Sequence, residues 1–300
     1  MAYSQIPFAE LPDGSQLRMD FLDSTWFKTH GQTRDFPAPE HLQTLFEPHE
    51  VPKPVRFEDL GLIVKFGSHI TTTEAINLWA IRRVCQDTLP VPEIYGWRVL
   101  ERQDGKDEVF IYMQLIQGPT LQQQWPELSA TDKQAICNDL RAKVTCLRSL
   151  RDSESQQVIG SICHGPGEDR CIEGLPLLRP FTSRTVFHDW LSWLWRRHVP
   201  DPDSIEDPWR NILPDNGPIV FTHGDIRPAN IIVTATTPVK VVAVLDWEQA
   251  GWYPDYWEDC KAKFTAPLDG EWRGLIDQFL EPHEAAVEAF DFYTYTLGKF

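Results

Sequence analysis

The feature that most constrains this chain is a polar loop held between short apolar runs in residues 218–248. Residues 218–221, 231–233 and 241–245 are rich in Val and Ile, which predicts three short strands. Asp225 and Asn230 lie between the first two runs, and Asp246 directly follows the third. We therefore expect three oxygen-bearing side chains to meet at neighbouring strand ends.

This set of side chains suits phosphoryl transfer. One carboxylate orients the attacking hydroxyl and accepts its proton, which is the role expected for Asp225. An amide and a second carboxylate hold Mg²⁺ on the donor phosphates, which are the roles expected for Asn230 and Asp246. The alternative is that these are ordinary turn residues at strand ends, because Asp and Asn both favour turns.

The spacing of these residues resembles that of a known family. His223, Gly224 and Asp225 followed by Asn230, and then Leu245 and Asp246, resemble the catalytic and metal-binding loops of the aminoglycoside phosphotransferase/choline kinase-like family. Asp225 and Asn230 match the kinase pattern Asp-x-x-x-x-Asn. The resemblance is greatest to the fungal members, whose substrates are mostly unassigned, and it covers residues 55–265.

The resemblance implies an α+β, bilobal protein-kinase-like fold. A small N-lobe would hold an antiparallel sheet and one key helix, and a larger, mainly helical C-lobe would follow. We expect residues 1–50 to form an N-terminal extension packed on the lobes. Residues 51–117 would form the N-lobe on the nucleotide side, and residues 118–300 the C-lobe with the catalytic loop and the acceptor site. The Gly118-Pro119 break marks the hinge between the lobes.

Lys65 and Glu74 are the charged residues that the resemblance singles out in the N-lobe. Lys65 lies in the apolar run 62–67, where a strand would place it on the same face as Ile63. The family resemblance implies that Lys65 grips the donor phosphates and that Glu74, on a helix over residues 71–85, pairs with it. The alternatives are an edge-strand lysine and a capping box formed by Thr71 and Glu74.

The resemblance also implies a nucleotide donor, ATP or GTP. Backbone groups near residues 113–116 would receive the base, so Met113 and Leu115 are assigned to this site. One departure from the family pattern weakens that assignment. Residues 54–61, which precede Lys65, hold a single Gly and no Gly-x-Gly-x-x-Gly loop, although such a loop normally brings backbone amides onto the phosphates.

Two groups of residues bear on the acceptor. Residues 251–255 are expected to form a turn that resembles a pocket-forming segment of the fungal members, so that Trp252, Asp255 and Glu258 would line a site for an amine-bearing ligand. The alternative is a structural corner with acids at a helix start. Arg227, two residues after the expected base, would neutralise the transferring phosphoryl group or pair with an acid. His223 is expected to brace the loop backbone.

Charge and composition limit the partners. The 28 Lys and Arg against 44 Asp and Glu leave a formal charge of −16, which argues against nucleic acid. This charge is compatible with a cationic small-molecule acceptor or with a surface that only favours solubility. The chain has no signal-peptide pattern and no run of about 18 apolar residues, so we expect a cytoplasmic protein without a membrane partner. Its six cysteines lack metal-site spacing and are expected to be reduced.

These observations favour a small-molecule phosphotransferase that moves the γ-phosphoryl group of ATP or GTP to an alcohol acceptor with Mg²⁺. The missing Gly-rich loop keeps an alternative open. In that alternative, a kinase-like scaffold has lost phosphotransfer and acts as a metabolite-binding protein or as a nucleotide-independent biosynthetic enzyme.

Overall fold

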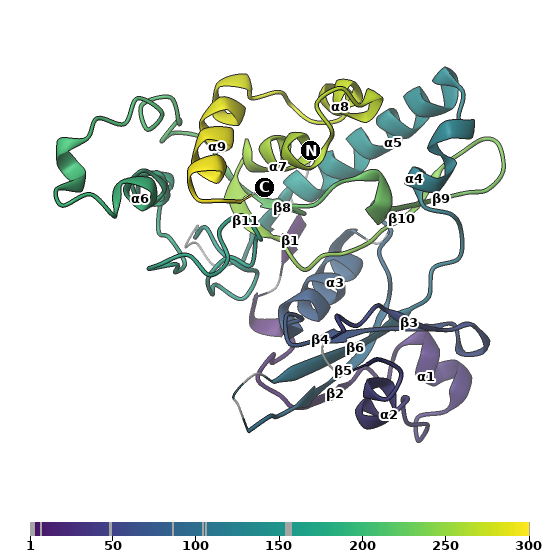
Figure 1. Cartoon of the computed structure of the whole chain (residues 1–300). Helices are drawn as coiled ribbons and strands as arrows, with labels where there is room; N and C mark the ends of the chain where they lie inside the picture. The colour runs from purple at the N-terminus through teal and green to yellow at the C-terminus, as the bar shows by residue number, and fades with distance from the viewer. Residues whose placement is uncertain are drawn as a thin grey trace.

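A five-stranded antiparallel sheet forms the N-lobe of this computed structural model, which describes residues 4–6, 8–47, 50–85, 87–103, 105, 107–153 and 158–299. In spatial order the strands are β2 (Arg18–Asp20), β5 (Ile94–Leu100), β6 (Glu108–Gln114), β4 (Leu62–Gly67) and β3 (Val55–Phe57). The mainly helical C-lobe lies above this sheet in Figure 1, with α3 (Thr72–Cys85) between the two. The expected α+β bilobal fold is confirmed.

Strand β4 shows how the sequence positions Lys65. Leu62, Val64 and Phe66 are buried in an aromatic cluster on one face of the sheet. The alternation of side chains along a strand places Ile63 and Lys65 on the opposite face, where both line a cavity between the lobes. The alternation of residues 62–67 is therefore sufficient to place the Lys65 side chain on the face that lines the cavity between the lobes.

The first 50 residues, which were expected to form an extension packed on the lobes, also add a strand to the sheet of each lobe. Strand β2 is the edge strand beside β5, and β1 (Ser4–Ile6) pairs in parallel with β7 (Leu150–Asp152) near the end of a C-lobe helix. Helices α1 (Thr25–His30) and α2 (Pro39–Gln43) supply aromatic and aliphatic side chains to the cluster on the sheet. The reason is pairing and burial: these short elements satisfy a sheet edge and cover an apolar face.

The C-lobe is built on α5 (Ala130–Arg148), which begins at a capping box between Ser129 and Asp132. Ile136, Leu140, Val144 and Leu147, which recur at helical spacing, are buried. The other α-helices described in this lobe are α4 (Leu121–Gln124), α6 (Arg184–Arg196), α7 (Trp257–Thr265), α8 (Glu271–Leu275) and α9 (Glu284–Thr296).

Two small antiparallel ribbons carry the polar loop. Strand β8 (Ile219–Thr222) pairs with β11 (Gly251–Pro254), and β9 (Ile231–Val233) pairs with β10 (Val241–Val244). Residues 251–254 were expected to lie in a turn, and this is wrong. Gly and Pro favour turns in isolation, but here pairing with β8 extends the backbone.

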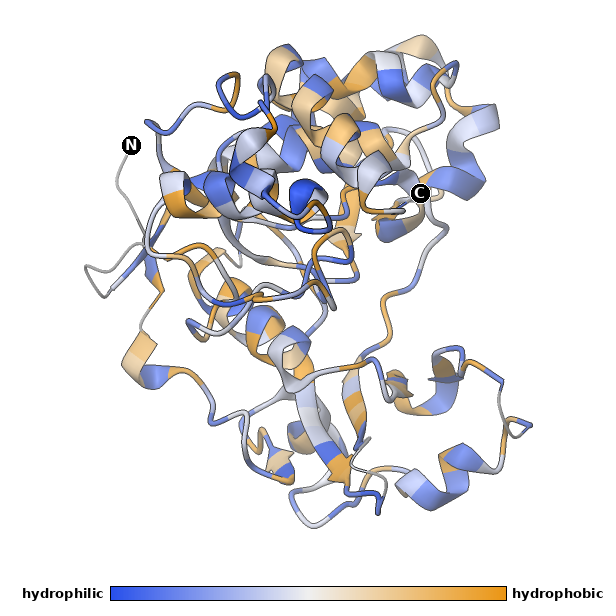
Figure 2. Ribbon diagram, turned by 60° about the vertical axis from the view of Figure 1, so that its left-hand side comes forward, coloured by the Kyte–Doolittle hydropathy of each residue, from blue (hydrophilic) through white to orange (hydrophobic). Residues whose placement is uncertain are grey.

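Short 3-10 helices complete the described elements: η1 (Phe8–Glu10), η2 (Glu58–Leu60), η3 (Trp125–Glu127), η4 (Pro202–Ser204), η5 (Pro228–Asn230) and η6 (Ile276–Gln278). Figure 2 shows apolar and polar residues alternating along the helices. One hydrophobic core runs from α3 through α5 to α9, so the N-lobe helix is packed against the C-lobe. No described helix is both long and apolar enough to cross a membrane.

Candidate functional site

The polar loop between β8 and β9 brings Asp225 and Asn230 into direct contact. Asn230 Nδ2 donates to Asp225 Oδ2 at 2.8 Å and to the Asp225 carbonyl at 3.0 Å. Helix η5 sets this contact, because it turns the chain back within the five residues that separate the two side chains. Burial raises the pKa of Asp225, and the nearby Arg227 guanidinium opposes this. The loop therefore holds a carboxylate whose orientation is restricted by an amide.

His223 joins this loop to the next strand. Its Nδ1 accepts the backbone N–H of Asp225 at 3.0 Å, and its Nε2 lies 2.9 Å from the carbonyl of Leu245. The ring therefore carries its proton on Nε2 and donates it to that carbonyl. Burial lowers the pKa of His223, which keeps the ring neutral. As expected, His223 braces the backbone, and in doing so it fixes Asp225 relative to Asp246.

A buried ion cluster surrounds Lys65. Its Nζ lies 2.6 Å from Asp246 Oδ1 and 2.8 Å from both Glu74 Oε2 and Glu248 Oε2. Burial alone would lower the pKa of Lys65, but the three carboxylates outweigh it and raise the pKa. Glu74 on α3 thus pairs with Lys65 in the structure, which favours the pairing over the capping-box alternative.

The charge of this cluster depends on Glu74. Burial raises the pKa of Glu74 to about 7, although Lys65 opposes the shift. The pKa of Asp246 is lowered, because Lys65 outweighs the effect of burial. Arg170 contacts the second carboxylate oxygen of Glu248. The cluster therefore holds a tightly bound lysine and carboxylates with opposite pKa shifts.

Glu248 is a member of this site that sequence reasoning missed. The signal was present, because Glu248 lies two residues after Asp246 and ends the same loop. Glu74, Asp246 and Glu248 each offer an oxygen within 4.8 Å of the other two. Asp246 adopts a left-handed backbone conformation, φ +66°, which is uncommon for a residue other than Gly and recurs at functional sites.

A cavity of about 310 Å³ lies beside the cluster, between the lobes. This volume is within the range of small-molecule sites. Asn230 and Asp246 line it from the C-lobe, and Lys65 lines it from the N-lobe. Hard oxygen ligands such as an amide oxygen and carboxylates are those that Mg²⁺ takes, so the donor set that faces this cavity fits a divalent cation.

Met113 and Leu115 both line this cavity, in the positions expected for the base. The backbone N–H of Leu115, however, donates to the carbonyl of Gly61 at 3.0 Å, because the sheet uses that amide internally. Ile116 follows it and also lines the cavity. The backbone N–H of Leu115 is therefore already used within the sheet, and the assignment of Met113 and Leu115 to the nucleotide base stays a prediction.

The residues expected at the acceptor site are placed elsewhere, and this assignment is corrected. Trp252 is buried in β11, with its ring 5.1 Å from that of Phe221. Glu258 is also buried, and its carboxylate accepts the backbone N–H groups of His223 at 2.6 Å and Gly224 at 3.1 Å. Asp255 pairs with Arg184 at 2.8 Å. The structural-corner alternative describes this segment, because Glu258 and Asp255 bind neighbouring parts of the same chain.

Arg227 pairs with Asp225, with its Nε 3.2 Å from Oδ2 and its side chain 41% exposed. The expected pairing of Arg227 with an acid is therefore observed, and its role toward the transferring phosphoryl group stays a prediction.

Two further buried side chains, Asn77 and Lys261, support the loop that carries Asp246, and neither was anticipated. Asn77 on α3 donates to the carbonyl of Trp247 at 2.9 Å. Lys261 on α7 contacts Asp169 at 2.7 Å and Gln249 Oε1 at 3.0 Å. Burial would lower the pKa of Lys261, but the Asp169 carboxylate raises it. Helices from both lobes therefore anchor residues 247–249.

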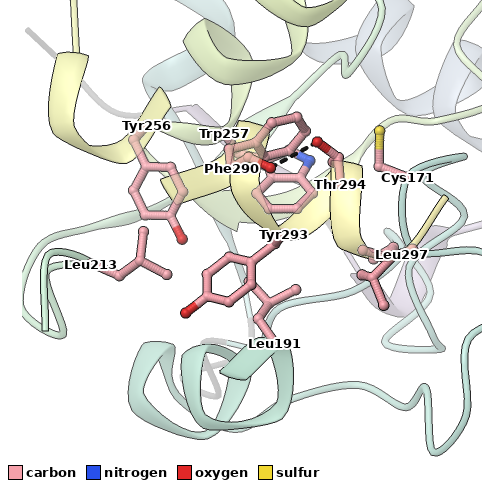
Figure 3. Close-up of a pocket in the computed structure, with 10 residues that line it drawn as sticks. Cys171, Leu191, Leu213, Tyr256, Trp257, Phe290, Tyr293, Thr294 and Leu297 are labelled. Carbon is pink, nitrogen blue, oxygen red and sulfur yellow. Dashed lines mark hydrogen bonds between the residues drawn. The ribbon is translucent and has the colours of Figure 1, made fainter. Parts of the chain in front are cut away.

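A separate apolar cavity lies inside the C-lobe, lined by side chains of α6, α7 and α9 that include Leu191, Trp257 and Tyr293 (Figure 3). It has a volume of about 10 Å³, which is space for a single water. Thr294 directs its hydroxyl to the Phe290 carbonyl at 2.8 Å within the same helix. This cavity is a packing gap of the core and plays no part in the site.

Comparison with known proteins places most of the chain in one family model. The family described as "Phosphotransferase enzyme family" matches residues 63–290. This span runs from β4 to α9 and includes Lys65, Glu74, Asp225, Asn230 and Asp246. The search among curated proteins found no match.

Solved structures with a similar shape include the streptomycin–ATP–APH(2'')-IIa ternary complex, at 12% identity over 87% of both chains and a TM-score of 0.49. ADP-bound APH(2'')-Ib is 16% identical over 85% of this chain and 84% of that one, with a TM-score of 0.46. A microcompartment-associated aminopropanol kinase is 16% identical over 79% and 76%, with a TM-score of 0.39.

Proposed function

This chain belongs to the phosphotransferase enzyme family, and we propose that it moves the γ-phosphoryl group of ATP or GTP to a hydroxyl of a small-molecule acceptor. The observation that carries the proposal is the convergence of Lys65, Asn230 and Asp246 on one cavity, with Asp225 hydrogen-bonded to Asn230. These side chains come from both lobes, and they supply a base, a cation and oxygen ligands.

Asp225 is the residue that orients the acceptor hydroxyl and takes its proton. Asn230 donates to one carboxylate oxygen and Arg227 lies beside the same oxygen, which leaves the other oxygen for the acceptor hydroxyl. Positioning supplies most of the rate in such transfers. The raised pKa of Asp225 makes it a better proton acceptor than an ordinary Asp.

Lys65 holds the non-transferred phosphates, and Glu74 keeps it in place. Mg²⁺ held by Asn230 and Asp246, with Glu248 as a further ligand, would neutralise charge on the donor phosphates. Three acids, Glu74, Asp246 and Glu248, lie against two basic side chains, Lys65 and Arg170. The residues therefore favour a bound cation.

The missing Gly-rich loop is compensated by side chains in this proposal. Strands β3 and β4 are joined by the short helix η2 and Gly61, and Arg56 of β3 lines the cavity. A guanidinium binds phosphate oxygens in a bidentate manner. We assign Arg56 to the donor phosphates, in place of the backbone amides of a Gly-rich loop.

The acceptor is proposed as a small molecule with a free hydroxyl. A net charge of −16 favours a cationic acceptor through long-range attraction. Arg227 next to Asp225 favours a neutral or anionic one at short range. An acceptor panel should therefore contain alcohols of each charge.

Nucleotide binding and transfer are tested separately. Thermal shift with ATP or GTP, with and without Mg²⁺, reports binding, and formation of ADP or GDP against the acceptor panel reports transfer. We expect Asp246→Asn to lose the Mg²⁺-dependent shift. Asp225→Asn should keep the shift and lose transfer by about 10²–10⁴-fold.

Asp269 is an exposed acid that follows α7 in the sequence. Asp269→Asn serves as the control and should change neither the thermal shift nor the transfer rate. If the folded wild-type protein shows no shift with either nucleotide and Mg²⁺, the proposal is contradicted, and a metabolite-binding scaffold becomes the better description.

A further inference from the structure

We propose that Cys85 and Cys146 form a reversible disulfide that joins helix α3 of the N-lobe to helix α5 of the C-lobe. The two sulfur atoms lie 3.2 Å apart, although the residues are 61 positions apart in the sequence. A disulfide has an S–S length of about 2.0 Å, so the sulfurs need to approach by only about 1 Å.

The two thiols sit at the C-terminal ends of helices from different lobes. Cys85 is the last residue of α3 and is buried, whereas Cys146 lies in the last turn of α5 and is half-buried. Their carbonyls are engaged by the turns that follow, Cys85 by Leu89 N–H at 2.8 Å and Cys146 by Ser149 N–H at 3.0 Å. Both backbones are therefore held while the side chains face each other.

The contact is specific to this pair within the described chain. All six cysteines are described, and the other four are Cys137, Cys163, Cys171 and Cys260. Of these, Cys171 contacts the Lys261 ammonium, and Cys163 is exposed. An oxidant that acted only by accessibility would modify Cys163, so a bond between Cys85 and Cys146 would report proximity.

The oxidation is a two-electron reaction with a hydroperoxide such as hydrogen peroxide. Cys146 is the more accessible thiol, and its sulfur attacks a peroxide oxygen: the O–O bond breaks, one water leaves and a sulfenic acid forms. The Cys85 sulfur then attacks the Cys146 sulfur, the S–O bond breaks and a second water leaves. Burial raises the pKa of the Cys85 thiol, which disfavours its direct reaction with the peroxide. Its contact with the Cys146 sulfur at 3.2 Å assigns Cys85 to the second step.

The bond would restrain the two lobes relative to each other. Helix α3 carries Glu74 and Asn77, which contact Lys65 and the loop after Asp246. Attaching its far end to α5 limits the separation of the lobes that ligand exchange requires. Formation of the bond does not depend on the proposed transfer reaction, so the two can fail independently.

The test uses the full chain, reduced or treated with a small excess of hydrogen peroxide. Non-reducing peptide mapping by mass spectrometry should find the peptides of Cys85 and Cys146 linked. Because the bond closes a 61-residue span, the Tm should rise by roughly 5–10 °C and return to its starting value with dithiothreitol. Cys163→Ser should behave as the wild type, and Cys146→Ser should lose both the link and the Tm shift.

Cys85→Ala provides the same comparison if Cys146→Ser fails to fold. The proposal is overturned if the folded protein reacts only at Cys163, or if the linked peptide appears only after the chain is unfolded. A linked peptide that forms in the native protein without a dithiothreitol-reversible rise in Tm would overturn the restraint on the lobes.

Discussion

Replacing Lys65 by Met tests whether the ion cluster is organised as the structure shows. The substitution keeps most of the aliphatic stem and removes the one ammonium that contacts Glu74, Asp246 and Glu248 at 2.6–2.8 Å. Glu74 is 1% exposed, so water cannot take over the solvation of its carboxylate. Removing one partner of a buried ion pair costs about 3–5 kcal/mol, and we expect a loss of this size at pH 8.

The loss should depend on pH in a defined direction. In the wild type the pKa of Glu74 is about 7, with Lys65 opposing the effect of burial. Without Lys65 this pKa must rise further, so the folded variant retains a proton that the wild type has released. Between pH 7 and the new pKa, the stability of the variant therefore falls relative to the wild type by up to about 1.4 kcal/mol per pH unit. Below pH 7 the difference should become constant.

Urea unfolding followed by the fluorescence of the 12 Trp residues, at pH 6 and pH 8, provides the measurement. Lys240→Met, at an exposed position, should change the free energy of unfolding by less than about 0.5 kcal/mol. The double variant Lys65→Met/Glu74→Gln should recover much of the loss, because it removes the buried charge along with its partner. A pH-independent loss below about 1 kcal/mol would refute the reasoning, since such a value is typical of an exposed ion pair.

Three further changes test other parts of the structure. Glu258→Gln turns an amide group toward one of the backbone N–H groups of His223 and Gly224, and we expect a loss of about 2–4 kcal/mol in urea unfolding and a lower kcat. Glu288→Gln, at an exposed position, is the control. Equal stability of the two variants would show that the hydrogen bonds from Glu258 to His223 and Gly224 do not stabilise the fold. His188 is buried against Asp215 and Tyr256, and burial lowers its pKa to about 4. The unfolded chain binds a proton below pH 6.5 that the folded chain does not, so stability should fall by up to about 3 kcal/mol between pH 6.5 and 4. His188→Gln should show a shallower decline, and an unchanged slope would count against this assignment. Gly96→Ala places a Cβ 2.3 Å from the Met19 carbonyl and should lower the Tm by separating β2 from β5. Gly274→Ala, which has open space, should not, and similar Tm values for the two would contradict the close approach of β2.

Much of the site was predictable because its signals are local. The alternation of residues 62–67 predicts the face of Lys65, and the spacing of Asp225 and Asn230 predicts a contact within one loop. The cap at Ser129 and the stripe along α5 follow from positions a few residues apart. In each case the interaction acts between residues close together in the chain, so residue types and their spacing are enough to predict it.

Other parts depended on chain segments far apart in sequence. Glu248 joins the cluster through a contact with Lys65 across 183 positions, and β11 is extended because it pairs with β8. Glu258 could serve a ligand or a neighbouring loop, and only the fold decides between them by burying it under His223 and Gly224. A carboxylate on a helix has no local feature that distinguishes these two uses.

The sequence by itself determined which functional groups the chain brings together: an aspartate and an asparagine in one loop, a second aspartate at a strand end, and a lysine on an apolar strand. The tertiary structure alone decided which acids line the cavity and which accept hydrogen bonds from the backbone or pair with an arginine. The physical reason is that the state of a buried carboxylate depends on the donors and charges around it, and these are brought there by distant parts of the chain.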